Sequence, residues 1–336
     1  MKKLITLAIV TLLLGTTACN TSQKTDNLDK TKETTDTVVN IGTMNLVNGD
    51  LIAQYEKFYE KELGTDVNIV NFDSGKDVNT ALASGSVDIS ELGSAPSALG
   101  ISNGVNFQVF WIGDVIGSAE SLVVKNNSGI NSISDLKGKK VATPFASTAH
   151  YSLLNALNLE GIKETDLELI DLQPSDIYAA WTRGDIDAAY IWYPVLSQLL
   201  KDGKIITGSD KLADKGIITA DLNVVRTEFA ENHPDIVKNY VKAQIKANNI
   251  ILNEPDKAAD EISKILEISK DDASSQLTQF KYLKAEEQID YLNNHIANAL
   301  KSTADFLVEQ DSIKSAPDLD EFKSKVNTEF IKEALK

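Results

Sequence analysis

The chain of 336 residues has one cysteine, Cys19, and three histidines that stand far apart in the sequence. A single cysteine cannot form an intrachain disulfide or a cysteine-rich zinc or iron–sulfur site. Histidines without an i, i+4 pair do not indicate a zinc site. The sequence also lacks the Gly-x-Ser-x-Gly motif of a nucleophile elbow. We therefore expect no metal, no cofactor and no catalytic residue, and we predict that the protein is not an enzyme.

Arginine is nearly as scarce, because the chain contains only Arg183 and Arg226. A clamp of several arginine side chains around a phosphate or sulfonate is therefore not available. The 33 lysines and arginines are outnumbered by 49 aspartates and glutamates, which gives a formal net charge of −16. Phosphate backbones are bound by basic surfaces, so we expect no nucleic-acid partner.

The N-terminus has the pattern of a bacterial lipoprotein signal. Two lysines precede a short apolar run, Leu4–Leu14, and small residues then lead to Cys19. The run is short for a membrane-spanning helix. We predict that residues 1–18 are a signal peptide and that Cys19 carries a lipid as the first residue of the mature protein. A plain signal peptide with a free Cys19, or an uncleaved anchor, remains open.

Residues 19–37 are predicted to be a flexible linker. They are mostly Thr, Lys, Asp, Glu and Ser, and they cannot bury enough apolar surface to offset the entropy of ordering. Such a segment reaches about 60 Å when fully extended. The folded part would then be extracytoplasmic and tethered to the cell membrane through the lipid anchor.

The rest of the chain has two characters. Between residues 38 and 215, β-rich runs such as Val67–Phe72 alternate with helical stretches such as Lys76–Ala83 and Leu51–Leu63. This alternation predicts an α/β fold with mostly parallel sheets covered on both faces. Residues 227–335 have helical periodicity, so we expect a helical C-terminal coat.

Three predicted strand-to-helix junctions carry small residues, most of them hydroxylated. They contain Ser74 with Gly75, Ser94, and Thr148 with Ala149. The first N–H groups of a helix lack intrahelical partners and lie at the positive end of its dipole, so helix starts bind anions. Ligands of open α/β sheets bind at the carboxyl ends of the strands. Converging helix starts could hold one oxyanion without arginine, although ordinary N-capping is the alternative interpretation.

Several stretches resemble the taurine-binding proteins of ABC importers. The likeness extends from about Val67 to Pro234 and thins out in the helical tail. The stretches that carry it are Phe72–Gly75, Ala81–Gly85, Leu92–Pro96, Val141–Leu154, Leu172–Pro174, Ala179–Pro194, Val224–Arg226 and Phe229–Pro234.

This resemblance implies a type II periplasmic-binding-protein fold, in which two α/β lobes joined by a two-stranded hinge close on the ligand. The first lobe would contain residues 38–118, and residues 216–336 would return to it and form the tail. The second lobe would be residues 119–215, with crossovers near Ala119–Leu122 and Ala220–Val224. The implied function is a monomeric receptor that delivers taurine or a related aminosulfonate to an ABC transporter permease.

A taurine-like ligand carries a sulfonate and an ammonium, and each charge needs its own partner when it is buried. The indole N–H of Trp192 would assist the helix starts at the sulfonate. The resemblance places Asp221 before the returning strand and Glu120 at the first crossover, where either acid could meet the ammonium. Glu120 could instead be a hinge acid, and Asp221 a turn former. The residues expected at the ligand are Ser74, Gly75, Ser94, Glu120, Thr148, Ala149, Trp192 and Asp221.

The sequence departs from the family's pattern at Thr43–Val47, at Ala149 and at Asn223. These departures leave open a receptor on the same fold for an alkanesulfonate, a nitrate-like anion or a pyrimidine precursor of thiamine. An enzyme on this scaffold is a further alternative, which no motif supports. Because neither the sulfonate nor the amine titrates near neutrality, we expect the affinity to be nearly constant from about pH 6 to 8.

Overall fold

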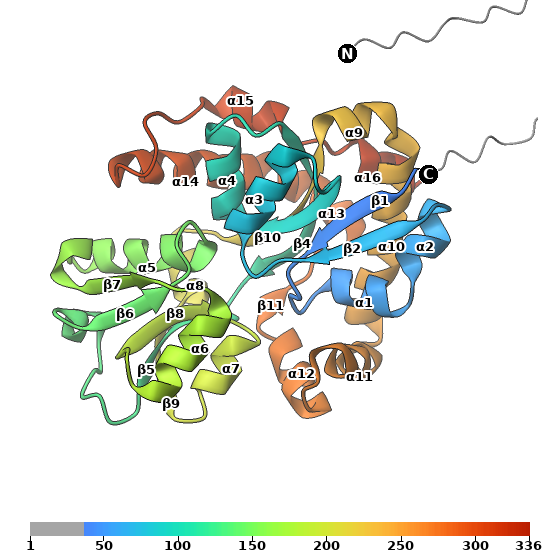
Figure 1. Cartoon of the computed structure of the whole chain (residues 1–336). Coiled ribbons are helices and arrows are strands. Elements are labelled where there is room, and N and C mark those ends of the chain that lie inside the picture. Colours follow the sequence, from blue (N-terminus) through green and yellow to red (C-terminus); the bar gives the residue numbers. More distant parts are fainter. Residues whose placement is uncertain (1–36) are drawn as a thin grey trace, which may run out of the picture. The chain divides into compact units, whose positions relative to one another are not determined.

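Two β-sheets organise residues 37–336, the part of the chain that the computed structural model describes (Figure 1). The predicted signal peptide, Cys19 and the predicted linker up to residue 36 lie outside these residues. Each sheet has its own buried apolar core, and helices flank both sheets. We call the six-stranded sheet with its helices the first lobe, and the five-stranded sheet with its helices the second lobe. The predicted α/β architecture is confirmed.

The sheet of the first lobe has the strand order β11-β4-β10-β3-β1-β2. β1 is parallel to β2 and β3, whereas β10 is antiparallel to β3 and β4, and β11 is antiparallel to β4. The strands are β1 (Val39–Thr43), β2 (Val67–Asn71), β3 (Ile89–Gly93), β4 (Phe107–Ile116), β10 (Ala220–Arg226) and β11 (Phe280–Lys281).

The sheet of the second lobe has the order β7-β6-β8-β5-β9. β6 is parallel to β7 and β8, and β5 is antiparallel to β8 and β9. The strands are β5 (Glu120–Lys125), β6 (Lys140–Thr143), β7 (Glu168–Asp171), β8 (Ala188–Trp192) and β9 (Gly203–Gly208).

The prediction of mostly parallel sheets is therefore wrong. Parallel pairing is found where strands and helices alternate in the sequence, as for β1 with β2 and β6 with β7. β5 enters the second sheet from the first lobe and is antiparallel to β8 and β9, and β10 returns to the first sheet and is antiparallel to β3 and β4. The strands that cross between the lobes therefore make both sheets mixed.

Sixteen α-helices surround the sheets within residues 37–336. The helices of the α/β part are α1 (Gly49–Tyr55), α2 (Phe58–Leu63), α3 (Gly75–Ser84), α4 (Ser94–Ser102), α5 (Thr148–Leu159), α6 (Pro174–Arg183), α7 (Val195–Leu199) and α8 (Ser209–Ala213). Those of the tail are α9 (Thr227–Asn232), α10 (Pro234–Asn253), α11 (Pro255–Leu266), α12 (Lys270–Leu277), α13 (Ala285–Tyr291), α14 (Ala297–Glu309), α15 (Leu319–Ser324) and α16 (Glu329–Ala334).

The predicted helix Leu51–Leu63 is divided into α1 and α2. Lys57 has a φ of 56°, in the left-handed region that a right-handed helix cannot continue through. The break leaves Tyr59 of α2 fully buried, with its hydroxyl donating to Asp50 of α1. The division therefore brings a side chain of α2 into a buried polar network at the start of α1.

The helical tail packs on both lobes. Tyr240 and Val241 of α10 and Leu300 of α14 belong to the core of the first lobe. Phe306 of α14 belongs to the core of the second lobe, where its ring meets Tyr151 of α5 edge to face at 5.3 Å between centroids. The tail therefore contributes buried surface to both lobes.

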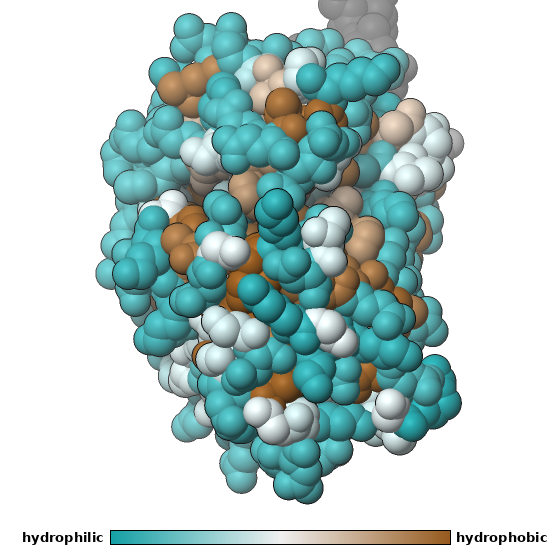
Figure 2. Space-filling model, turned by 90° about the vertical axis from the view of Figure 1, so that its left-hand side faces the viewer, coloured by the Kyte–Doolittle hydropathy of each residue, from teal (hydrophilic) through white to brown (hydrophobic). Residues whose placement is uncertain are grey.

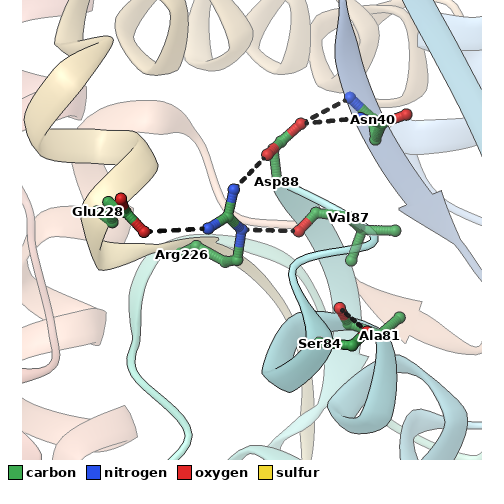
Figure 3. Close-up of polar contacts among 7 residues, drawn as sticks. All are labelled: Asn40, Ala81, Ser84, Val87, Asp88, Arg226 and Glu228. Carbon is green, nitrogen blue, oxygen red and sulfur yellow. Dashed lines mark hydrogen bonds and ion pairs between the residues drawn. The ribbon is translucent and has the colours of Figure 1, made fainter. Parts of the chain in front are cut away.

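Arg226 stabilises the end of β10 that is far from Asp221 (Figure 3). Its guanidinium donates to Asp88 Oδ1 at 2.7 Å and to the carbonyl oxygen of Val87 at 3.0 Å. Asp88 Oδ2 in turn accepts from the backbone N–H of Asn40 at 2.9 Å. The other arginine, Arg183, forms an exposed ion pair with Asp185. Both arginines therefore have structural partners on the protein.

The surface is largely hydrophilic, in keeping with the charged composition. In Figure 2, hydrophilic side chains cover most of the visible face, and apolar side chains show between them in small groups. Within residues 37–336, no helix is both long enough and apolar enough to cross a bilayer.

Two short segments connect the lobes. Residues 117–119 join β4 to β5, and residues 214–219 join α8 to β10. The segments are neighbours, because the N–H of Ile116 donates to the carbonyl oxygen of Thr219 at 3.0 Å. Glu120 follows the first segment immediately, and Asp221 lies one residue beyond the second. The connections thus bring together two acids that are about a hundred residues apart in the sequence.

Candidate functional site

A small cavity lies between the lobes, beside the two connections. Its place at the carboxyl ends of strands, next to helix starts, is where open α/β sheets bind ligands. The first lobe and the tail contribute Met44, Leu46, Gly75, Gly93, Pro96, Ile116, Asp221 and Phe280, and the second lobe contributes Glu120, Ser147, Thr148 and Trp192.

Five of the predicted ligand-binding residues line this cavity. They are Gly75, Glu120, Thr148, Trp192 and Asp221. The structure thus brings together residues from five separate stretches of the sequence and from both lobes.

The other three predicted residues lie behind the cavity wall. The hydroxyl of Ser74 donates to Asp77 Oδ2 at 3.0 Å, and Ser94 Oγ accepts from the backbone N–H of Ala220 at 3.3 Å. Ala149 is completely buried in the second core. Their side chains support the wall and are not part of it.

Three helix starts contribute to the cavity wall. α3 begins at Gly75, α4 begins after Gly93, and α5 begins after Ser147, whose Oγ accepts from the N–H of His150 at 3.1 Å. Each helix has at least nine residues, so the aligned peptide dipoles place a partial positive charge at its start. The expected convergence of the three strand-to-helix junctions is therefore present in the structure.

A glycine permits the close approach of two of these helix starts. A Cβ atom on Gly93 would lie 2.7 Å from Cγ2 of Thr148, which belongs to the other lobe. Real side chains do not approach that closely. Glycine at position 93 is thus required for the observed distance between α4 and α5.

Glu120 is held by three hydroxyl groups. Its carboxylate accepts from Thr148 Oγ1, from Ser152 Oγ at 3.1 Å and from Ser209 Oγ at 2.8 Å. The side chain is almost completely buried. Burial raises the pKa of Glu120 to about 6, although the three donors act in the opposite direction. Thr148 is therefore a support of this acid as well as part of a helix start.

Asp221 stands directly opposite Asp114 on the neighbouring antiparallel strand. Both side chains are buried, and within residues 37–336 no lysine, arginine or histidine forms an ion pair with either. Burial, and after it the charges of Asp114 and Glu120, raise the pKa of Asp221 well above its usual value. Burial also raises the pKa of Asp114 to about 7, against hydrogen bonds from Asn48 and Asp221.

More carboxyls lie behind this pair, and we call Asp50, Glu91, Asp114, Glu120 and Asp221 the acidic cluster. Nδ2 of Asn48 donates to Glu91 and to Asp114, and Asp50 accepts from Tyr240 and Gln244 at 2.7 and 2.8 Å. Burial, and then the charges of Asp50 and Asp221, raise the pKa of Glu91 well above its usual value. No three His, Cys, Asp or Glu side chains among residues 37–336 are arranged to hold a metal ion.

The members of the cluster that the sequence analysis missed had a detectable signal. Glu91 and Asp114 stand within strands whose other residues are largely apolar, and a charged residue there is rarely accidental. The apolar wall was missed as well. Met44 and Leu46 lie in the segment that departs from the family pattern, whereas Phe280 reaches the cavity only because β11 pairs with β4.

Two α/β lobes, two neighbouring connections and a cavity between the lobes define the fold of a type II periplasmic binding protein. The sequence matches the family described as NMT1/THI5 like over residues 46–258, and the chain belongs to this family.

Individual relatives agree with this assignment. A taurine-binding periplasmic protein of Escherichia coli (strain K12) is 40% identical over 83% of this chain and 88% of its own length. A putative aliphatic sulfonates-binding protein of Bacillus subtilis (strain 168) is 31% identical over 100% of this chain and 97% of its own length. The alkanesulfonate-binding protein SsuA from Xanthomonas axonopodis pv. citri, solved with bound MOPS, superimposes with a TM-score of 0.73 at 21% identity, covering 87% of this chain and 98% of that one.

We expect the unliganded protein to lose stability as the pH rises from about 5.5 to 8. The folded state keeps protons on Glu120 and on the pair of Asp114 and Asp221 that the unfolded chain releases near pH 4. The unfolded state then binds fewer protons over this range, so the free energy of unfolding falls with pH. Thermal unfolding should show a decrease in Tm of about 3 °C for an effect of about 2 kcal/mol.

The variant Asp114→Asn removes one of these titrating groups with little change of shape. Its Tm at pH 8 should exceed that of the wild type, and its pH dependence should be weaker. Asp214→Asn is the matched control, because it makes the same change of charge at an exposed position. An identical pH dependence in all three proteins would show that the buried pair does not have raised pKa values.

Proposed function

We propose that the protein is an extracytoplasmic solute-binding protein that delivers taurine or a related aminosulfonate to an ABC importer. It acts as a monomer without catalytic activity, and a lipid on Cys19 holds it at the cell membrane. The observation that carries the proposal is the composition of the cavity wall. Three helix starts and two buried carboxyls share one cavity, with no cationic side chain among its lining residues.

The helix starts provide partners for the sulfonate. Backbone N–H groups at the starts of α3, α4 and α5 lack intrahelical acceptors and lie at the positive ends of three dipoles. Trp192 lines the same cavity and offers an indole N–H, which donates without adding charge. Ser74, Ser94 and Ala149 contribute their backbone positions at or next to these helix starts.

The carboxyls provide partners for the ammonium. Glu120 already accepts three hydroxyl hydrogen bonds. Asp221 faces Asp114 across the strand pair, and within residues 37–336 no cationic side chain forms an ion pair with it. An ammonium group would give Asp221 the cationic partner that the described side chains do not provide, which makes this residue the main determinant of selectivity for an amine.

The similarity to the E. coli taurine-binding periplasmic protein supports this ligand class. The alternative ligand is a plain alkanesulfonate, because Met44, Leu46, Ile116 and Phe280 form an apolar wall that suits an alkyl chain. An alkanesulfonate would leave the buried carboxyls without a cation, so the acidic cluster favours the aminosulfonate. Nitrate-like anions and thiamine-precursor pyrimidines on the same fold lack this charge complementarity.

We expect the purified protein to bind taurine in calorimetry, and Asp221→Asn to weaken that binding by about 30-fold or more. The loss reflects removal of one partner from a buried charge pair, which costs about 2 kcal/mol or more. Ethanesulfonate, which lacks the amine, should bind the wild type and Asp221→Asn with similar affinity. Asp214→Asn serves as the control for general electrostatics. No heat with millimolar taurine, in protein shown to be free of bound ligand, would refute the assignment.

The variant Gly93→Ala should weaken taurine and ethanesulfonate equally, by about tenfold or 1.4 kcal/mol. Its methyl group would strike Cγ2 of Thr148 at 2.7 Å and hold the starts of α4 and α5 apart. The double variant Gly93→Ala/Thr148→Ser lacks the obstructing methyl and keeps the hydroxyl that Glu120 accepts from, so it should recover affinity. Failure of the double variant to recover would show that the spacing of these helix starts does not determine affinity.

The lipid anchor is tested separately in cells. Cys19→Ser should abolish incorporation of labelled fatty acid and release the protein from the membrane fraction. Retention at the membrane with Ser at position 19 would contradict the proposed lipidation and would leave the ligand assignment unaffected.

A further inference from the structure

The pairing of Asp221 with Asp114 is unfavourable for two charged carboxylates. The two residues are direct partners in the antiparallel register of β10 and β4, where like charges destabilise a sheet. Asp114 is completely buried, and its Oδ1 atom has no donor among residues 37–336. Its other oxygen, Oδ2, accepts from Nδ2 of Asn48 at 3.1 Å.

The surroundings of the pair add negative charge. Glu91 faces it from β3, Asp50 from the start of α1, and Glu120 from the start of β5. The remaining titratable neighbour is Tyr282, whose hydroxyl donates to the carbonyl oxygen of Val47 at 2.6 Å. Within residues 37–336, no cationic side chain forms an ion pair with Asp50, Glu91, Asp114, Glu120 or Asp221. A proton is therefore the available cation while the cavity is empty.

We infer that Asp221 and Asp114 share one proton in the empty protein, and that an ammonium group entering the cavity displaces this proton into solvent. The inference rests on the proposed function, because it requires a ligand with an amine. Asp221 lines the cavity and contacts the ligand, whereas Asp114 is a positioning residue that acts through Asp221. One ammonium group of the ligand enters as one proton leaves, so the charge at the carboxyl pair is unchanged, and the liganded protein as a whole becomes more negative by one.

Proton release makes the affinity depend on pH. Below the apparent pKa of the pair, the affinity for an aminosulfonate should rise by about tenfold for each pH unit, because each binding event releases one proton. A plain alkanesulfonate displaces nothing and should bind without this dependence. The nearly constant affinity expected from the ligand's own charges thus applies to the alkanesulfonate and not to taurine.

The test is calorimetry of the purified full-length protein at pH 6.5 in cacodylate and in imidazole, two buffers with different ionisation enthalpies. Sulfonate buffers are avoided because they resemble the ligand. The difference between the two binding enthalpies gives the number of protons released, which should be about one for taurine and about zero for ethanesulfonate. Equal enthalpies for taurine in both buffers would overturn the inference while leaving the taurine assignment intact. Absence of taurine binding would instead overturn the proposed function.

Asp114→Asn identifies the source of the proton. Asparagine can donate to Asp221, which then stays ionised in the empty protein, so proton release should fall to about a third or less and the pH dependence should flatten. Asp214→Asn should release as many protons as the wild type. Undiminished release from Asp114→Asn would show that the proton comes from Glu120 or from the ligand's amine, and it would refute the role of the pair.

Discussion

The burial of two opposed carboxyls without a cationic side chain is the constraint on which the site depends. Asp114 and Asp221 are brought together by strand register, and that register is fixed by the sheet as a whole. The folded protein therefore buries two carboxyls in an unfavourable arrangement, which a ligand with a positively charged group can stabilise. A cation from solvent or from a ligand is needed at this position, and the adjoining cavity admits one.

The other half of the site uses backbone groups. Arg226 joins β10 to β3 at the opposite end of the strands, and Arg183 pairs with a surface acid. The positive side of the cavity is thus made from the starts of α3, α4 and α5, whose approach depends on Gly93. Helix dipoles and N–H groups are fixed in direction, so they favour an anion of defined size more selectively than flexible lysines would.

The sequence predicted the parts of this arrangement that are encoded locally. The alternation of strands and helices indicated two α/β lobes, and the small residues before helices indicated the helix starts that contribute to the cavity wall. Asp221 and Glu120 were identified through the family resemblance. The prediction of one continuous helix over Leu51–Leu63 was wrong, because the left-handed conformation of Lys57 has no clear sequence signal.

What the sequence did not predict depends on contacts between distant segments. The antiparallel pairing of β10 with β4 makes Asp114 the partner of Asp221. This register cannot be predicted from the local sequence of either strand. Phe280 reaches the cavity wall through a two-residue strand far along the chain. Asp114 and Glu91 each stand within a largely apolar strand, which indicates a buried carboxyl but not the partner that this carboxyl faces.

A crystal structure of the protein with taurine is the most direct test of this arrangement. The ammonium nitrogen should lie within hydrogen-bond distance of the Asp221 carboxylate, and the sulfonate oxygens should accept from backbone N–H groups at the starts of α3, α4 and α5. A taurine molecule bound in the reverse orientation, or bound without contact to Asp221, would contradict it.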